Sequence, residues 1–191
     1  MNANGTGTTQ LTQVTSRAEC PYQSCFGGVT LSPDGSQIAY VSDQDGWARQ
    51  ELYVMNSDGS DKTRVSFAGE GSSEGRTWNH QPHWSPDGNK IAYITVTEEE
   101  DVVRWKVLDI DHDTERTLVD FEPSEELLML FSFFDQYAYS HQLWSPDSKS
   151  IVIAAKSGAH DALYLINVNT GKDEKIDFNL DGVFTASWSP D

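Results

Sequence analysis

One stretch of the sequence recurs along the chain and indicates its architecture: His83-Trp84-Ser85-Pro86-Asp87-Gly88, followed by Ile91-Ala92-Tyr93. The other copies are Leu31-Ser32-Pro33-Asp34-Gly35 with Ile38-Ala39-Tyr40, Trp144-Ser145-Pro146-Asp147-Ser148 with Ile151-Val152-Ile153, and a final Trp188-Ser189-Pro190-Asp191. In each of the three longer copies the apolar triplet begins five residues after the proline. Such self-similarity indicates a repeat architecture.

Each repeat predicts four short strands. Ser-Pro-Asp-Gly favours a type I turn in which glycine supplies the positive φ that closes a hairpin. A third strand is expected at residues 52–56, 105–110 and 163–169, and a short fourth strand at 63–66, 116–119 and 174–176. Four strands per repeat predict the blades of an all-β β-propeller.

The motifs Trp-Ser-Pro-Asp-Gly, Ile-Ala-Tyr, Leu-Tyr-Val-Met-Asn and Thr-Arg-Val-Ser resemble the WD-repeat-like blades of TolB-type β-propeller proteins. The resemblance covers nearly the whole chain. It implies a non-catalytic scaffold that binds a protein partner in the cell envelope, so neither enzyme activity nor a cofactor is expected. Similar blades also serve peptidases and lyases, so the fold alone does not decide the function.

The repeats predict three complete blades, at residues 26–66, 80–120 and 141–178. Residues 1–25 are expected to hold the end of a preceding blade and a linker, because residues 1–12 align with 55–66. Residues 67–79 read as a loop, 121–140 as an apolar insertion and 179–191 as the start of another blade. A closed propeller needs four to eight blades. We therefore expect a fragment of a larger propeller, whose remaining blades or self-association cover its ends.

The overall composition excludes some partners. The net charge of −17, with 30 acidic and 13 basic residues, argues against nucleic acid. No apolar run is long enough to span a membrane, and no signal peptide is visible. Cys20 and Cys25 could form a disulfide or remain two thiols. Together with the TolB resemblance, these features predict a periplasmic or extracellular location.

The candidate partner-binding residues come from the inner strands and from the insertion. The resemblance implies that the first strand of each blade lines the central channel, which places His80, Gln81, His83, His141 and Gln142 there. In the insertion, an apolar run suggests either a plug against the propeller or a docking patch for a partner. Its residues singled out for docking are Phe131, Phe133 and Phe134.

A peptidase is the first alternative. Gly71-Ser72-Ser73-Glu74-Gly75 matches the G-x-S-x-G pattern of α/β-hydrolases, but it lies in a linker without the strand and helix of a nucleophile elbow. We therefore expect no nucleophile there. The chain could still be the gating propeller of a prolyl-oligopeptidase-type serine peptidase whose catalytic domain lies outside these residues.

A polysaccharide lyase is the second alternative, with channel histidines on a metal ion. Because side chains alternate along a strand, His80 and His83 are expected to point to opposite faces, which argues against a shared metal. Asp109-Ile110-Asp111-His112-Asp113 begins like a calcium-binding loop but lacks the glycine and glutamate that complete one. It is expected to be a turn, and no metal site is predicted.

Two positions depart from the repeat. Leu31 replaces the tryptophan of the first copy and Ser148 replaces the turn glycine of the third. These departures predict a looser first junction and a less favourable third turn.

Overall fold

The computed structural model describes residues 6–12, 26–44, 49–67, 77–97, 103–121, 142–157, 160–176 and 186–189. These residues form eleven strands and no α-helix, which confirms the all-β prediction. Within these ranges, accordingly, no helix has the length and apolarity that a membrane crossing requires.

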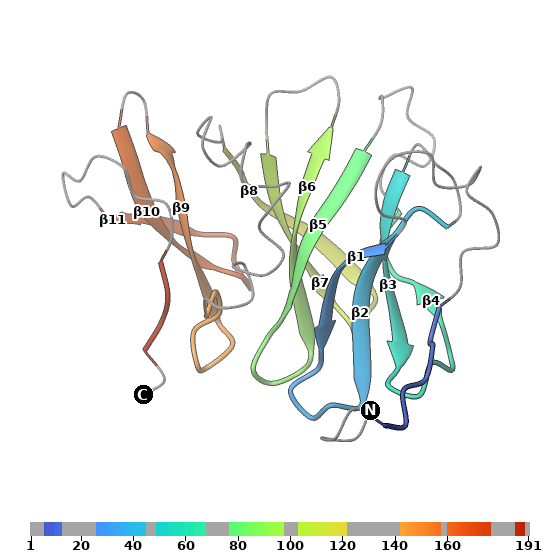
Figure 1. The fold of residues 1–191 in the computed structure, drawn as a ribbon. Coiled ribbons are helices and arrows are strands. Elements are labelled where there is room, and N and C mark those ends of the chain that lie inside the picture. The colour runs from blue at the N-terminus through green and yellow to red at the C-terminus, as the bar shows by residue number, and fades with distance from the viewer. Residues whose placement is uncertain are drawn as a thin grey trace.

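The strands form three neighbouring antiparallel groups (Figure 1). The first two groups join into one eight-stranded sheet, and the third is a separate three-stranded sheet. The first blade contains β1 (Phe26–Leu31), β2 (Gln37–Ser42), β3 (Arg49–Asn56) and β4 (Thr63–Arg64). The second contains β5 (Thr77–Trp84), β6 (Lys90–Thr97), β7 (Val103–Asp109) and β8 (Thr114–Phe121). The third contains β9 (Ser150–Ser157), β10 (His160–Asn167) and β11 (Asp173–Ile176), with Trp144 bridged to Ile151 ahead of β9. Within each group, strands that follow one another in the sequence pair antiparallel, as they do in a propeller blade.

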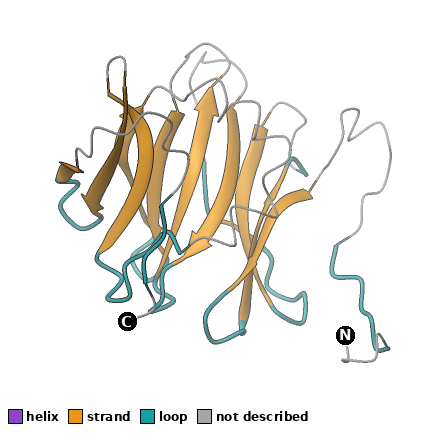
Figure 2. Cartoon of the chain, turned by 60° about the vertical axis from the view of Figure 1, so that its left-hand side comes forward, coloured by secondary structure: helices purple, strands orange, loops and turns teal. Residues whose placement is uncertain are grey.

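The repeated turn is held by its serine and aspartate. The Ser32 hydroxyl donates to Asp34 Oδ1 at 2.6 Å and accepts the backbone N–H of Gln37 at 2.9 Å. Hydrogen bonds from Ser32, and from the backbone and hydroxyl of Ser36, lower the pKa of Asp34 to about 2. Ser85 and Ser145 make the same bonds in the other two turns. Figure 2 shows the described hairpin turns gathered mainly at one end of the sheets.

Two apolar clusters lie between the blades. Side chains alternate along β6, so Ile91 and Tyr93 face the first blade while Ala92 and Ile94 face the third. The cluster between the first two blades also contains Ala39, Val41, Leu52, Val54, Trp84 and Leu108. The cluster between the second and third contains, among others, Val103, Trp105, Val107, Trp144, Ile151, Ile153 and Ile166. Each blade is therefore held by apolar burial on the face it turns to its neighbour.

The repeated tryptophan also makes a polar link between blades. Trp84 Nε1 donates to the Thr30 carbonyl at 3.4 Å, Trp144 Nε1 to the His83 carbonyl at 3.0 Å, and Trp188 Nε1 to the Leu143 carbonyl at 3.1 Å. In each case the acceptor is the residue just before the repeated tryptophan position of the preceding blade. Leu31, which replaces the first tryptophan, has no such donor and is 58% exposed.

The first two blades share a short backbone junction that the repeats do not predict. Arg49 pairs in parallel with Thr77 and Gln50 with Trp78, so β3 and β5 join the two sheets. Buried polar side chains, among them Glu51 and Asn79, lie next to this junction.

Candidate functional site

Strand β5 carries the predicted channel residues and contains a β-bulge. His80 pairs with Ile94 and His83 pairs with Ala92, so Gln81 and Pro82 together oppose a single residue of β6. Gln81 has a φ of 51°, in the left-handed region that costs a side-chain-bearing residue about 1–2 kcal/mol. Gly28, at the same place in β1, has a φ of 52°. The bulge therefore recurs in the first two blades, and of these two the first has glycine at the left-handed position.

The bulge places His80 and His83 on the same face of the sheet. Their partners Ile94 and Ala92 both face the third blade, and paired residues share a face. The prediction that the two imidazoles point to opposite faces is wrong, because the additional residue of the bulge resets the alternation.

His83 lies in the junction between the second and third blades. Its ring centroid is 6.3 Å from that of Trp105, with the planes inclined at 47°. Burial lowers the pKa of His83 to about 4, because the charged imidazolium loses its hydration. The ring is therefore neutral at neutral pH, where it packs as a largely apolar group.

The metal-dependent alternative lacks a ligand set in the described part of the chain. Two imidazoles now share a face, but a catalytic zinc-type site uses three protein ligands. No group of three or more His, Cys, Asp or Glu residues that could hold a metal occurs within the described ranges. In the calcium-like stretch, Asp109 Oδ1 accepts the backbone N–H of His112 at 3.1 Å within the β7–β8 turn. That carboxylate organises a turn.

The other predicted residues divide into two groups. Gln142 contributes its backbone: its N–H donates to Ser187 Oγ at 2.9 Å, and its carbonyl accepts the Trp188 N–H at 3.1 Å. The remaining predicted residues lie outside the described ranges: His141, Phe131, Phe133 and Phe134. The Gly71–Gly75 pattern and both cysteines lie outside them too. The structure thus groups His80, Gln81 and His83 on β5 and places Gln142 at the next junction.

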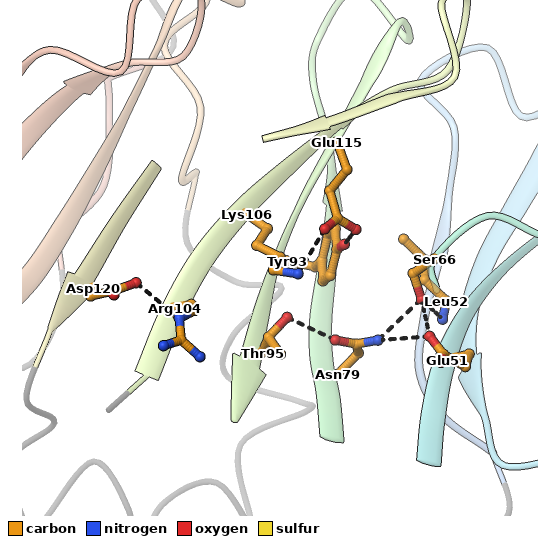
Figure 3. Close-up of polar contacts among 10 residues, drawn as sticks. All are labelled: Glu51, Leu52, Ser66, Asn79, Tyr93, Thr95, Arg104, Lys106, Glu115 and Asp120. Atoms are coloured by element: carbon orange, nitrogen blue, oxygen red, sulfur yellow. Dashed lines mark hydrogen bonds and ion pairs between the residues drawn. The ribbon is translucent and has the colours of Figure 1, made fainter. Parts of the chain in front are cut away.

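Sequence reasoning missed a buried polar cluster, which we call the junction network: Glu51, Ser66, Asn79 and Thr95 (Figure 3). Asn79 Nδ2 donates to Glu51 Oε2 at 3.3 Å and to Ser66 Oγ at 3.1 Å. Asn79 Oδ1 accepts the Thr95 hydroxyl at 2.8 Å, and Ser66 donates to Glu51 at 2.5 Å. Each of the four residues is at most 3% exposed.

The junction network fixes the two blades relative to each other. Glu51 follows Gln50 on β3 and Asn79 follows Trp78 on β5, so the network begins where the parallel pairing ends. Its burial keeps it from touching a ligand, and it acts by positioning the two strands. Polar residues inside apolar strands were the only available signal, since a sequence does not show which of them meet.

A second polar group connects Tyr93 of β6, Lys106 of β7 and Glu115 of β8 (Figure 3). The Tyr93 hydroxyl donates to Glu115, whose carboxylate also pairs with Lys106 Nζ at 2.7 Å. Burial, reinforced by the nearby carboxylate of Glu115, raises the pKa of Tyr93 well above its usual value. Tyr93 therefore remains a neutral hydrogen-bond donor.

Comparisons with known proteins connect this fold to a family. The family described as the dipeptidyl peptidase IV (DPP IV) N-terminal region matches residues 8–126. Dipeptidyl-peptidase 5 of Porphyromonas gingivalis is 31% identical over 156 residues, which cover 76% of this chain and 20% of that protein. Dipeptidyl-peptidase 5 of Porphyromonas endodontalis is 38% identical over 79 residues, which cover 39% of this chain and 10% of that protein. The chain thus spans a fifth or less of these two relatives.

Solved structures agree on the fold. Dipeptidyl peptidase 4 of Porphyromonas gingivalis superposes with a TM-score of 0.58 and 10% identity, covering 82% of this chain and 25% of that one. A putative TolB from Agrobacterium tumefaciens gives a TM-score of 0.51 and 19% identity, covering 78% and 45%. The TolB-like propeller fold predicted from the repeats is confirmed.

The same comparisons correct the prediction about activity. The expectation that the protein is not an enzyme is wrong, because its relatives are named dipeptidyl peptidases. The blade motifs resemble those of TolB-type proteins, and the scaffold prediction followed from that resemblance. Similar blades also occur in peptidases. A shared blade motif reports the fold and leaves the activity undetermined.

Proposed function

Because the chain belongs to the family of dipeptidyl peptidase IV N-terminal regions, we propose that it is the β-propeller part of a larger peptidase of the prolyl-oligopeptidase type. The supporting observation is the family match over residues 8–126, together with the two dipeptidyl-peptidase relatives. In this proposal the bond-breaking serine belongs to an α/β-hydrolase domain beside the propeller. The substrates are peptides from which that domain removes dipeptides.

The propeller's task in this proposal is to limit access to the catalytic serine. A rigid ring of blades admits short or unfolded peptides through its channel and excludes folded proteins. The observed architecture suits such a filter, since apolar seams and tryptophan links hold adjacent blades together. The inner-strand residues His80 and Gln81 then lie along the path of a peptide.

The location proposed for the protein is the periplasm or the cell exterior, where peptides are available as nutrients. Fractionation of the native cells tests this point independently of activity. Recovery of the protein with a cytoplasmic marker would contradict the location and leave the peptidase proposal standing.

Activity of the full-length protein tests the peptidase proposal. We expect hydrolysis of dipeptidyl p-nitroanilides and inactivation by a fluorophosphonate, which acylates activated serines. Ser73→Ala is the matched control within this chain, because the Gly71–Gly75 pattern is not expected to supply the nucleophile. Full activity in Ser73→Ala supports a nucleophile in another domain. Absence of hydrolysis and of labelling in the folded full-length protein would favour the scaffold hypothesis.

A further inference from the structure

The first two blades are tied together at both ends of their junction. At the turn end, where the Ser-Pro-Asp turns lie, Trp84 Nε1 donates to the Thr30 carbonyl (Figure 2). At the opposite end, which we call the far end, the starts of β3 and β5 pair in parallel through Arg49 and Gln50. The junction network lies beside this pairing. The two blades therefore form one eight-stranded sheet.

The third blade is attached differently, because β9–β11 form a separate sheet (Figure 1). Within the described ranges, hydrogen bonds link it to the second blade near the turn end. They join the Asp87 N–H to Ser148 Oγ at 3.0 Å, Trp144 Nε1 to the His83 carbonyl at 3.0 Å, and the Arg116 guanidinium to the Asn169 carbonyl. These residues belong to the turns or to the strand ends beside them.

The far end of this second junction is apolar where the first junction is polar. In the repeat alignment, Glu51, Ser66 and Thr95 of the junction network correspond to Arg104, Val119 and Ala155. Arg104 Nε pairs at 3.2 Å with Asp120 of its own blade. Val119 and Ala155 pack in the apolar cluster between the blades and have no polar side-chain atom. The counterpart of Asn79, Tyr139, lies outside the described residues.

This difference affects how easily each junction opens. Apolar burial stabilises the second junction but has no preferred direction, so blades can separate at its far end while the bonds at the turn end persist. Separation of the first junction would break backbone pairing and expose a buried polar network. Proteins open locally where the fewest such interactions must be lost.

We propose that the third blade hinges about the turn end, so that the second junction opens at its far end. The first two blades move as one body. The hinge concerns the motion of blades alone, so it stands or falls separately from the peptidase proposal.

Thiol labelling of the native full-length protein tests the hinge. Val103→Cys on β7 and Ala155→Cys on β9 place thiols on the two sides of the second junction, at positions 1% and 7% exposed. Val41→Cys, at a position 3% exposed in the first junction, is the control and repeats the Val103 substitution. Mass spectrometry of the labelled peptides separates these thiols from Cys20 and Cys25. Urea unfolding of each variant gives its global stability.

We expect a maleimide to label both second-junction thiols at similar rates, at least about tenfold faster than Val41→Cys, because one local opening exposes both. Equal rates at all three positions, following global stability, would overturn the proposal. Fast labelling of Val103→Cys alone would also overturn it, since fraying of β7 would then be the cause.

Asn79→Leu tests whether the two junctions open independently. The substitution removes the junction network, so it should accelerate labelling of Val41→Cys. It should leave the labelling rate of Val103→Cys within about twofold, because the two junctions are separate. Parallel acceleration at both positions would show that the blades open together and would contradict the hinge.

Discussion

The backbone N–H of Asp87 donates a hydrogen bond of 3.0 Å to the hydroxyl of Ser148, across the junction between the second and third blades. Ser148 has a φ of 60° and is 4% exposed, at the position where the other two turns have glycine. The substitution that makes the third turn less favourable therefore also supplies a contact between blades that glycine could not make.

Ser148→Ala and Ser148→Gly should separate these two effects. Alanine loses the hydrogen bond and keeps the left-handed strain, so we expect a loss of about 1 kcal/mol in unfolding free energy. Glycine loses the same bond but relieves backbone strain of about 1 kcal/mol. The unfolding free energy of Ser148→Gly should therefore differ from that of the wild type by only about a few tenths of a kcal/mol. Urea unfolding measures both. A glycine variant as unstable as the alanine variant would contradict the strain argument.

The tryptophan links should differ in strength according to their geometry. Trp144→Phe removes a 3.0 Å hydrogen bond and leaves a small cavity, for an expected cost of about 2 kcal/mol. Trp84→Phe removes a 3.4 Å bond and should cost less. The comparison uses the same substitution in equivalent positions of one repeat. Equal losses in urea unfolding would show that ring packing, and not the hydrogen bond, dominates the link.

The junction network should respond strongly to a change of one atom. In the wild type, Asn79 Nδ2 donates to Glu51 Oε2 at 3.3 Å. Asn79→Asp replaces this nitrogen with a carboxylate oxygen beside the Glu51 carboxylate. We expect a loss of about 3 kcal/mol at neutral pH, because two buried carboxylates repel each other. Part of that loss should return as the pH is lowered, because protonation of either carboxyl removes the repulsion.

Asn79→Leu is the control for this experiment. It removes the same donor without adding a carboxyl, so its stability should recover less on acidification than that of Asn79→Asp. Equal pH dependence in the two variants would contradict the assigned contact between Asn79 and Glu51.

His83 should make the fold sensitive to mild acid. The unfolded chain takes up a proton near pH 6.5, while burial holds the pKa of folded His83 at about 4. Stability contributed by the neutral ring is therefore complete above pH 6.5 and declines as the pH falls toward 4. His83→Gln should remove this component from a plot of unfolding free energy against pH. An unchanged pH profile in His83→Gln would show that His83 is not buried as described.

The repeats predicted the fold because each motif residue has a local reason to occur. Serine and aspartate close the turn, glycine accepts the positive φ, and alternating apolar residues fill the seams. These constraints act within a few residues, and a sequence therefore shows them directly.

The site was predicted less well because it depends on backbone irregularity and on contacts between blades. Gln81 takes a left-handed φ without being glycine, so the bulge that reorients His80 and His83 leaves no mark in the sequence. Asn79 and Glu51 meet only because β3 and β5 pair in parallel, and nothing local encodes that pairing. The scaffold prediction is not confirmed, because the comparisons favour the peptidase alternative and blade motifs report the fold alone.

The peptidase proposal is tested by the mass of the native polypeptide that contains residues 1–191 and reacts with a fluorophosphonate. We expect a labelled polypeptide several times longer than 191 residues, with the label on a serine outside this segment. A native polypeptide of 191 residues that remains unlabelled while folded would contradict it.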